Sequence, residues 1–569
     1  MSNLILGINS TGFNTASCLI KNGKLISAVE EERITREKRT RKFPIESIKY
    51  NLLKAGVSFD QLNTIAISWN PAINLEAHNL AQSERSRFLG EIFYSVPSHL
   101  LKLSKNKVGD ISEQQIELSN KSKIKIIYIK HHFCHAANYF LSPFDEAAIM
   151  TVDAFGETNS TTFSIGKKNK IKNIWHQDFP HSLGGFYSTF TEFLGFKPQN
   201  DEWKLMGASS YGDPKRYLGK IRQLVNLNNN GFELDLTYFN FYQFHRPNRF
   251  TTKLSKLLGI NPNISGVPLK NCYFDLAASA QVVFEDIYIH LLKILKKKTN
   301  LDKVVISGGS ALNCVANGKI LNTTGFKKIF VPPFPDDSGC SIGAAFYVHN
   351  QLMNKKKKFY LRTNYLGPSY SDLEIERILI DYKINYKKSK NITKEVANLI
   401  SEGKIIGWFQ GGIEFGDRAL GNRSILADPR DSTMKDKVNK TVKYREEFRP
   451  FAPAILAEQV NKYFEKADYT PFMEKTYIIK KNQRKKIPAV VHVDGSGRLQ
   501  TVSKDINPIF YKLISEFEKI SKIPIILNTS FNLKGEPIVC SPVDAIRTFF
   551  SSGLDYLTLG SFLIKKNER

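Results

Sequence analysis

Cysteine is scarce in this chain, and its apolar runs are short. Six cysteines occur in 569 residues, far apart and without a CxxC pair, which is too few to staple a chain of this size with disulfides. No run approaches the ~18 apolar residues needed to cross a bilayer. The first ten residues also lack the basic region and apolar stretch of a signal peptide. We therefore expect a protein of the reducing cytoplasm with no membrane partner.

Acidic residues are outnumbered by basic ones. The chain has 81 Lys and Arg against 54 Asp and Glu, a net charge of +27, which attracts anionic partners such as nucleotides, phosphorylated substrates or RNA. The lysines stand in short scattered runs, with no RNP-type aromatic motif or zinc finger between them. We interpret most of them as a solvated surface, so a nucleic acid is not the favoured partner.

The length and one basic stretch divide the chain. Single cores stop growing near ~250–300 residues, so 569 residues predict more than one domain. Residues 351–370 are basic and then rich in turn formers, which is typical of a linker. We expect an N-terminal domain over 1–355 and a C-terminal domain over 356–569, the latter a mixed sheet of alternating strands and helices.

A short β-meander occurs twice in the first half. Residues 3–29 contain three apolar runs, the first two separated by the turn at 10–14, and residues 147–171 repeat this arrangement. Two such units about 140 residues apart predict a duplicated nucleotide-binding fold. The polar turns of such units can offer backbone N–H groups to a phosphate.

A glycine turn follows a third apolar strand. Residues 303–317 read as a β-branched strand, then Gly308 and Gly309, then the start of a helix. This arrangement lets a ligand approach the backbone closely. An ordinary turn between strand and helix is the alternative.

Two histidines have the spacing of metal ligands. His131 and His135 are four residues apart, so both imidazoles lie on one face of a predicted helix and could bind one metal, while His132 points elsewhere. Two histidines with two carboxylates suit Fe(II), Mn or Zn. Hydrogen-bonded structural histidines and helix-capping aspartates are the alternative. The candidate carboxylates are Asp153, at the end of a strand, and either Asp336 or Asp337.

Basic residues gather in glycine- and proline-rich segments between 411 and 539. This context favours an anion pocket that binds phosphate or carboxylate, rather than a solvated helix face. Structural salt bridges are the alternative for each residue. The candidates are Arg418, Arg423, Lys443, Arg445, Arg449 and Arg498.

The motifs form an ordered set from the first strand to about residue 560. They read HHFCHAANYF, VISGGSALNCVAN, DDSGCSIGAA, EFGDRALGNRSILADPR, KYREEFRPFAPAIL, HVDGSGRLQTV and LNTSFN…GEPIV. Together they resemble the O-carbamoyltransferase family of nodulation-factor and antibiotic biosynthesis.

The resemblance implies an α/β protein with two domains. The larger N-terminal one would have the duplicated actin-like ATPase fold, and the smaller α/β C-terminal one would be similar to threonylcarbamoyl-adenylate synthase. In this family, carbamoyl phosphate and ATP, with Mg²⁺, give carbamoyl adenylate. The carbamoyl group then passes to a hydroxyl of a small natural product. Homodimers are common among the relatives.

The resemblance also assigns residues. It implies a divalent metal, generally iron, on His131, His135, Asp153 and Asp337. It places Lys443 and Arg498 in catalysis, together with Asn14 at a family histidine position. The residues that would bind nucleotide or carbamoyl phosphate are Gly207, Gly308, Gly309, Asn313, Arg418, Arg423, Lys443, Arg445, Arg449, Arg498, Asn528, Ser530 and Asn532.

Two positions depart from the family pattern. The family histidine that is the natural candidate for taking the acceptor's proton is Asn14 here, and an amide cannot act as a base near neutral pH. Asn14 is either an engineered replacement or belongs to a natural enzyme that uses another base or the metal. In both cases we expect adenylate formation to survive and transfer to be slow. A family Lys-His pair is also changed, to Lys38-Arg39.

Two other functions compete with small-molecule carbamoylation. A tRNA threonylcarbamoyladenosine-type modification enzyme would use both kinds of domain, and its RNA would match the net charge. A non-catalytic nucleotide-binding module is the third class. The motif RALGNRSILADPR favours the carbamoyltransferase.

Overall fold

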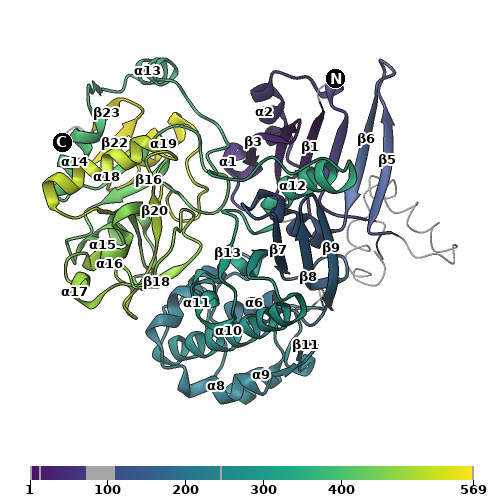
Figure 1. Ribbon diagram of the computed structural model, residues 1–569. Helices are drawn as coiled ribbons and strands as arrows, with labels where there is room; N and C mark the ends of the chain where they lie inside the picture. The colour runs from purple at the N-terminus through teal and green to yellow at the C-terminus, as the bar shows by residue number, and fades with distance from the viewer. Residues whose placement is uncertain (1–2, 12–13, 72, 74–108, 244–245, 567–569) are drawn as a thin grey trace. The chain divides into compact units, whose positions relative to one another are not determined.

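The computed structural model describes residues 3–11, 14–71, 73, 109–243 and 246–566 (Figure 1). The chain forms two units. Unit 1 comprises Met1–Ala28 and Arg41–Leu361, and unit 2 comprises Arg362–Arg569 together with Val29–Thr40. We call Val29–Thr40 the strap. The division therefore differs from the single boundary near residue 355 that the sequence predicts, because the strap comes from the N-terminal half of the chain but belongs to unit 2.

Two sheets with equivalent strand orders form the centre of unit 1. In the first, the antiparallel pair β2 and β1 continues into parallel β4 and β6, in the order β3-β2-β1-β4-β6-β5. In the second, antiparallel β9, β8 and β7 continue into parallel β12 and β13. Its order β9-β8-β7-β12-β13 thus corresponds to β3-β2-β1-β4-β6 of the first sheet. The repeated order confirms the duplicated actin-like ATPase fold. Residues 12–13 of the first predicted turn lie outside the described residues.

The strands of unit 1 have short bounds, and most of their residues are buried. They are β1 (Leu4–Asn9), β2 (Ala16–Lys21), β3 (Lys24–Glu30, which runs into the strap), β4 (Thr64–Ile67), β5 (Ile111–Glu117), β6 (Lys123–Ile129), β7 (Glu146–Val152), β8 (Asn159–Lys167), β9 (Lys170–Asp178), β10 (Val225–Asn228), β11 (Gly231–Leu234), β12 (Lys303–Ser307) and β13 (Lys328–Phe330).

The helices of the N-terminal half include one short helix of the strap, α1 (Glu31–Thr35). Among the described helices none is long and apolar enough to cross a membrane. The others are α2 (Ile45–Ala55), α5 (His131–Ala136), α6 (Leu183–Phe193), α7 (Glu202–Ala208), α8 (Lys215–Arg222), α9 (Thr252–Leu258), α10 (Asn271–Thr299), α11 (Cys314–Thr323) and α12 (Asp337–Phe346).

Helix α12 lies close to both β1 and α5 because small residues line the contacts. A Cβ on Gly7 of β1 would lie 2.0 Å from the Ser341 carbonyl oxygen, and one on Gly343 would lie 1.9 Å from the Cys134 carbonyl oxygen. Only glycine allows such an approach. The sequence DSGCSIGAA therefore lets α12 pack directly on α5, which sets the first residue of α12, Asp337, beside the histidines of α5.

Unit 2 is built on one mixed sheet of eight strands, in the order β14-β23-β22-β15-β16-β21-β17-β20. Its core includes Trp408, Phe510, Phe517 and Phe531, all buried. Amphipathic helices cover the sheet, and α14 buries the i, i+4, i+8 series Ile392, Val396 and Ile400. The mixed α/β prediction is confirmed.

The bounds of the unit 2 elements complete the description. The strands are β14 (Lys387–Lys388), β15 (Ile406–Phe409), β16 (Arg423–Ala427), β17 (Ala452–Leu456), β18 (Thr476–Ile478), β19 (Ser496–Arg498), β20 (Gln500–Val502), β21 (Ile525–Ser530), β22 (Tyr556–Leu559) and β23 (Phe562–Lys565). The helices are α13 (Asp372–Asp381), α14 (Ile392–Ser401), α15 (Met434–Val438), α16 (Val460–Tyr463), α17 (Lys481–Arg484), α18 (Pro508–Ser521) and α19 (Pro542–Phe550).

Candidate functional site

Four side chains of unit 1 converge on one point, and we call them the metal cluster: His131, His135, Asp153 and Asp337. One ligand atom from each lies within 4.8 Å of the others. Asp153 Oδ2 is 3.3 Å from His131 Nε2 and 3.0 Å from His135 Nε2. Asp337 Oδ1 lies 3.5 Å and 3.7 Å from the same two nitrogens. Of the two aspartates that the sequence left open, Asp337 is the one that joins the histidines.

The far sides of both imidazoles are held by protein groups. His131 Nδ1 is 3.2 Å from the Ser68 carbonyl oxygen, and His135 Nδ1 is 3.4 Å from Ser307 Oγ. Such contacts orient metal-binding histidines. His132 instead contacts Thr151 Oγ1 at 2.7 Å and the Asn159 carbonyl at 2.9 Å, which confirms that it points elsewhere.

The charges of the metal cluster are complementary. Burial alone would lower the pKa of His131, but Asp337 and Asp153 raise it well above its ordinary value. Burial acts to raise the pKa of Asp153, but its hydrogen bonds with His131 and His135 hold it well below its usual range.

The donor set fits a divalent transition metal. The Nε2 atoms of His131 and His135 are only 3.0 Å apart. If His131 donates from Nδ1 to the Ser68 carbonyl, its Nε2 lone pair faces the cluster. Two imidazole nitrogens and two carboxylate oxygens around one point suit Fe(II), Mn(II) or Zn(II).

The predicted glycine turn abuts the metal cluster. A Cβ on Gly308, whose φ is +101°, would lie 2.1 Å from the Val152 carbonyl oxygen, so this glycine is required for packing against β7. The N–H of Gly309 donates to Asp153 Oδ1 at 3.3 Å. The turn thereby holds one carboxylate of the metal cluster. The sequence predicted that a ligand approaches this turn, and it did not indicate the contact with Asp153.

The other residues assigned to the nucleotide cleft lie near this turn. Asn313 caps α11 by accepting from the Ala316 N–H at 3.0 Å. Gly207 is in α7, and its neighbour Met206 contacts Cys314 through sulfur atoms 3.8 Å apart. These contacts bring Gly207 and Asn313 to neighbouring elements, and their roles in nucleotide binding stay predictions.

Asn14 is tied to the N-terminus of α12. Its backbone has a positive φ of 44°, and its side-chain amide donates to Asp336 Oδ2. In the same turn, Thr11 Oγ1 donates to Asp337 Oδ2 at 3.1 Å. Asn14, at the family histidine position, therefore bonds to the residue that directly precedes Asp337 of the metal cluster.

A second group of charged residues lies in unit 2, and we call it the cation cluster: Lys443, Arg445, Arg449 and Arg498. Lys443 is buried and its Nζ donates to Asn532 Oδ1 at 2.7 Å and to Ser530 Oγ at 3.2 Å. The structure therefore brings Ser530 and Asn532 to Lys443, and the roles of the three residues in binding stay predictions.

The cation cluster has little opposing charge. Burial holds the pKa of Lys443 well below its usual range, and Arg445, Arg449 and Lys38 lower it further. The pKa of Arg445 is likewise lowered by burial, then by Arg449 and Arg498, with Glu446 acting against them. An anion placed among these groups would reverse the shifts, because it favours every charged form at once.

The strap anchors itself in unit 2 by buried ionic contacts that the sequence analysis missed. Arg33 Nε lies 2.9 Å from Glu30 Oε2, and Arg33 Nη2 donates to the Gly416 carbonyl at 2.8 Å. Glu30 Oε1 accepts from the Gly416 N–H at 3.0 Å. Arg36 pairs with Asp544 at 3.3 Å. In the sequence, the only signal was the density of alternating charges in EEERITREKR.

The strap also carries charge toward the cation cluster. Lys38 is among the groups that lower the pKa of Lys443. Its neighbour Arg39 lies 3.7 Å from Asp417. The two residues that replace the family's Lys-His pair thus border the segment that contains Arg418.

Two predicted anion-site residues have structural contacts instead. Arg423 is buried over the face of Phe409, with its guanidinium carbon 3.5 Å from the ring centroid. It also donates to the backbone carbonyls of Gln410, Asn422, Pro368 and Gly411.

Asn528 is likewise held by protein groups. Its Nδ2 donates to Gln500 Oε1 at 2.8 Å and to the Ala419 carbonyl at 3.2 Å. The side chains of Arg423 and Asn528 are therefore held by protein groups, and their roles in anion binding stay predictions.

Glu414 is a further residue that the sequence reading missed. It is buried, and its Oε1 accepts from the N–H groups of Leu420 and Asn422 at 2.7 and 2.8 Å. These bonds fix the loop that includes Arg418. A carboxylate that organises a loop in this way leaves no spacing signal in the sequence.

Both halves of the chain match known protein families. The family descriptions "Carbamoyltransferase N-terminus" and "Carbamoyltransferase C-terminus" match residues 4–346 and 397–566. Nodulation protein NolNO of Sinorhizobium fredii is 37% identical over 97% of this chain and 78% of its own length. Uncharacterized protein MJ1051 of Methanocaldococcus jannaschii is 34% identical over 99% of this chain and its own full length.

Solved structures resemble the chain only distantly. Full-length HypF in the phosphate- and nucleotide-bound form is 15% identical, covers 63% of this chain and 56% of its own, and has a TM-score of 0.32. The ROK hexokinase of Thermus thermophilus is 14% identical, covers 62% of this chain and all of its own, and has a TM-score of 0.26. The two family matches and the relatives over nearly the whole chain establish that this protein belongs to the carbamoyltransferase family.

Proposed function

We propose that the protein is an ATP-dependent O-carbamoyltransferase with one reaction in each unit. Unit 2 would convert carbamoyl phosphate and ATP to carbamoyl adenylate, and unit 1 would transfer the carbamoyl group to a hydroxyl of a small natural product. The observation that carries this proposal is the cation cluster, where burial and the neighbouring cations Arg445, Arg449 and Lys38 lower the pKa of Lys443, and where Ser530 and Asn532 hold its ammonium group.

The chemistry requires such a cluster. Water cleaves carbamoyl phosphate to carbamate and phosphate, and a carbamate oxygen then bonds to the α-phosphorus of ATP while the bond to pyrophosphate breaks. Both substrates are anions that repel each other. Lys443 and the arginines would bind the phosphates and bring the reacting groups together, which lowers the barrier by positioning and charge stabilisation.

The metal cluster would serve the transfer step. When bound, a divalent metal there would neutralise an adenylate phosphate and polarise the reacting carbonyl. The chain's own part is to hold that ion on His131, His135, Asp153 and Asp337, with Ser68 and Ser307 orienting the imidazoles. Transfer breaks the bond from the carbamoyl carbon to AMP and forms one to the acceptor oxygen, whose proton must leave.

The test is direct detection of the intermediate. The full chain is incubated with ATP, Mg²⁺ and carbamoyl phosphate but no acceptor, and mass spectrometry follows carbamoyl adenylate and pyrophosphate. We expect both to form, and to be lost in Lys443→Met. Lys440→Met is the matched control, because Lys440 is an exposed lysine in the same segment.

Two results would contradict the proposal. ATP binding without either product would indicate a nucleotide-binding module. Salt-sensitive tRNA binding together with threonylcarbamoyl transfer to tRNA would indicate the tRNA-modifying alternative.

A further inference from the structure

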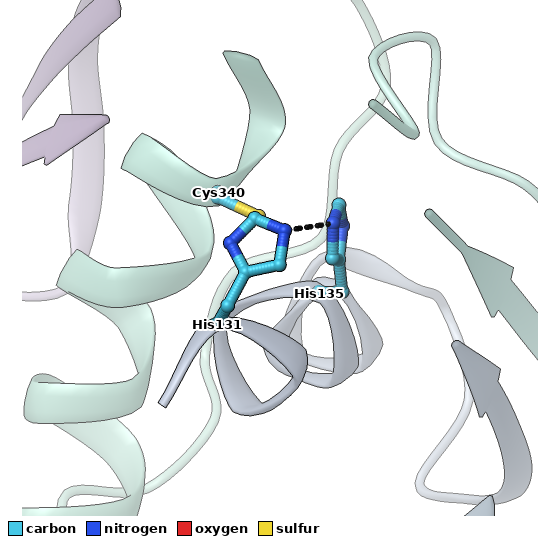
Figure 2. A group of neighbouring side chains, drawn as sticks. All are labelled: His131, His135 and Cys340. Atoms are coloured by element: carbon cyan, nitrogen blue, oxygen red, sulfur yellow. Dashed lines mark hydrogen bonds between the residues drawn. The ribbon is translucent and has the colours of Figure 1, made fainter. Parts of the chain in front are cut away.

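A cysteine lies beside the histidine pair of the metal cluster. Cys340 follows Asp337 by three residues on α12, so both side chains project from the same side of that helix. The ligand atoms of Cys340, His131 and His135 lie within 4.8 Å of one another. Figure 2 shows the thiol at the His131 ring, with the two imidazoles in contact.

The Cys340 thiol has no competing partner among the residues that the structure describes. It is fully buried and makes no hydrogen bond there. The neighbouring buried thiols differ, since Cys18 donates to the Ser341 carbonyl and Cys134 to the Ile129 carbonyl. No hydrogen bond therefore competes with a metal for the Cys340 sulfur, which lies close to the two imidazoles.

Packing fixes the cysteine in this position. Gly339 and Gly343 flank Cys340 on α12, and a Cβ on either would lie 2.0 Å or less from a backbone oxygen of a neighbouring segment. The helix therefore cannot shift away from α5 without losing these contacts. Around a tetrahedral zinc, Zn–N distances near 2.0–2.1 Å and a Zn–S distance near 2.3 Å bring ligand atoms to about 3.3–3.7 Å of one another. The ligand atoms of the three residues, all within 4.8 Å of one another, are close to that range.

The two ligand sets share the histidines and differ in the rest. One set adds the two carboxylates Asp153 and Asp337, and the other adds the thiol of Cys340. Carboxylates suit harder ions such as Mn(II), whereas thiolate ligands suit Zn(II) and other softer ions.

We propose that Cys340 gives the histidine pair a second way to bind a metal, in which its thiolate coordinates Zn(II) or Co(II) together with His131 and His135. The thiol proton is released to solvent as the metal–sulfur bond forms. The inference concerns cation binding alone, so it can fail while carbamoyl adenylate still forms in unit 2, and the reverse.

The first experiment needs no variant. The full-length protein is freed of metal with a chelator and loaded with one equivalent of Zn(II), and X-ray absorption reports the ligand shell. We expect one sulfur at about 2.3 Å in addition to nitrogen at about 2.0–2.1 Å. A shell of nitrogen and oxygen alone would overturn the proposal.

The second experiment uses Co(II) and a conservative pair of variants. The wild-type protein should show a near-ultraviolet thiolate-to-Co(II) band, which Cys340→Ser should lose and Cys134→Ser should retain. Cys134 is the matched control, because its thiol is buried on α5 but already bonded to a carbonyl. Retention of the band in Cys340→Ser, or its loss only in Cys134→Ser, would overturn the assignment. If Cys340→Ser does not fold, the zinc spectrum of the wild type decides.

Discussion

In unit 1 the buried ionisable groups of the metal cluster face partners of opposite charge, whereas in unit 2 the buried Lys443 is surrounded by further cations. The first arrangement places two imidazoles and two carboxylates where they can share one cation. The second has more positive than negative charge, since Glu446 is the acidic group that acts on Arg445 and pairs with Arg449, so it favours an anion. The metal cluster of unit 1 therefore favours a cation and the cation cluster of unit 2 favours an anion. Changing one cluster while measuring both metal binding and anion binding tests this difference.

The largest effect is expected from removing a histidine of the metal cluster. His135→Ala should weaken metal binding by more than about 100-fold, because loss of a ligand costs more than loss of the groups that orient it. Metal content after dialysis measures this, and phosphate binding should stay unchanged. His176→Ala, which changes an exposed histidine, is the control. Equal metal content in His135→Ala and wild type would refute the cluster.

Restoring the family histidine sharpens the comparison at the transfer step. Asn14→His should raise the rate of carbamoyl transfer by about 100-fold, the lower range for a positioned general base, and leave adenylate formation unchanged. Single-turnover transfer from preformed carbamoyl adenylate to an acceptor measures it. A variant no faster than the wild type would mean that another group takes the acceptor's proton.

Removing Lys443 should weaken anion binding in unit 2 and leave metal binding in unit 1 unchanged. Lys443→Met loses hydrogen bonds to a charged group, worth about 1.5–3 kcal/mol, so affinity for inorganic phosphate should fall about 10- to 150-fold. Calorimetric titration of wild type, Lys443→Met and Lys440→Met gives the comparison. Unchanged phosphate affinity in Lys443→Met would show that the cation cluster does not bind phosphate through Lys443. The metal content of each variant is the internal control.

Anion binding should weaken as the pH rises. The pKa of Lys443 is depressed in the free protein, and a bound anion raises it, so binding takes up a proton. Above the depressed pKa the affinity should therefore fall by up to about tenfold per pH unit. Sulfate is the proper probe because it does not titrate in this range. Calorimetry in buffers of different ionisation enthalpy measures the proton uptake, and proton release would contradict the assignment.

The smallest effect is expected at the edge of the cation cluster. Lys38 is exposed, so Lys38→Ala should weaken phosphate binding only about two- to fivefold, as is usual for a solvated charge. High salt should erase the difference. The exposed lysine Lys440, changed to alanine, provides the baseline. A loss as large as that of Lys443→Met would mean that Lys38 contacts the ligand directly.

Local periodicity made the metal cluster predictable. A spacing of four residues on a helix put His131 and His135 on one face, and a strand end exposed Asp153. The choice between Asp336 and Asp337 could not be made in the same way, because it depends on how α12 packs against α5 and β1. Cys340 was missed for the same reason. The duplicated meanders were predictable because each is a local hairpin pattern, and the paired sheets followed from them.

Long-range partners limited the prediction for unit 2. Lys443 bonds to Ser530 and Asn532, whereas the side chain of Arg423, from an equally polar motif, bonds to a cage of backbone carbonyls. The segments around Lys443 and Arg423 have similar charge and glycine content, so composition could not distinguish the two environments. The strap was not predicted either, because nothing near Arg33 in the sequence indicates that its acceptor is the carbonyl of Gly416. The roles of these residues in catalysis stay predictions until measured.

The strap also sets an order of events during synthesis. Arg33 and its acceptor Gly416 are 383 residues apart in the chain. At about 5–20 residues per second, a ribosome needs about 20–80 seconds to add that length. During this interval the strap has left the ribosome without the rest of unit 2, while Arg41–Leu361 of unit 1 is made. Its dense charges would keep it hydrated while it waits, and its buried ionic contacts can form only once the later segment exists.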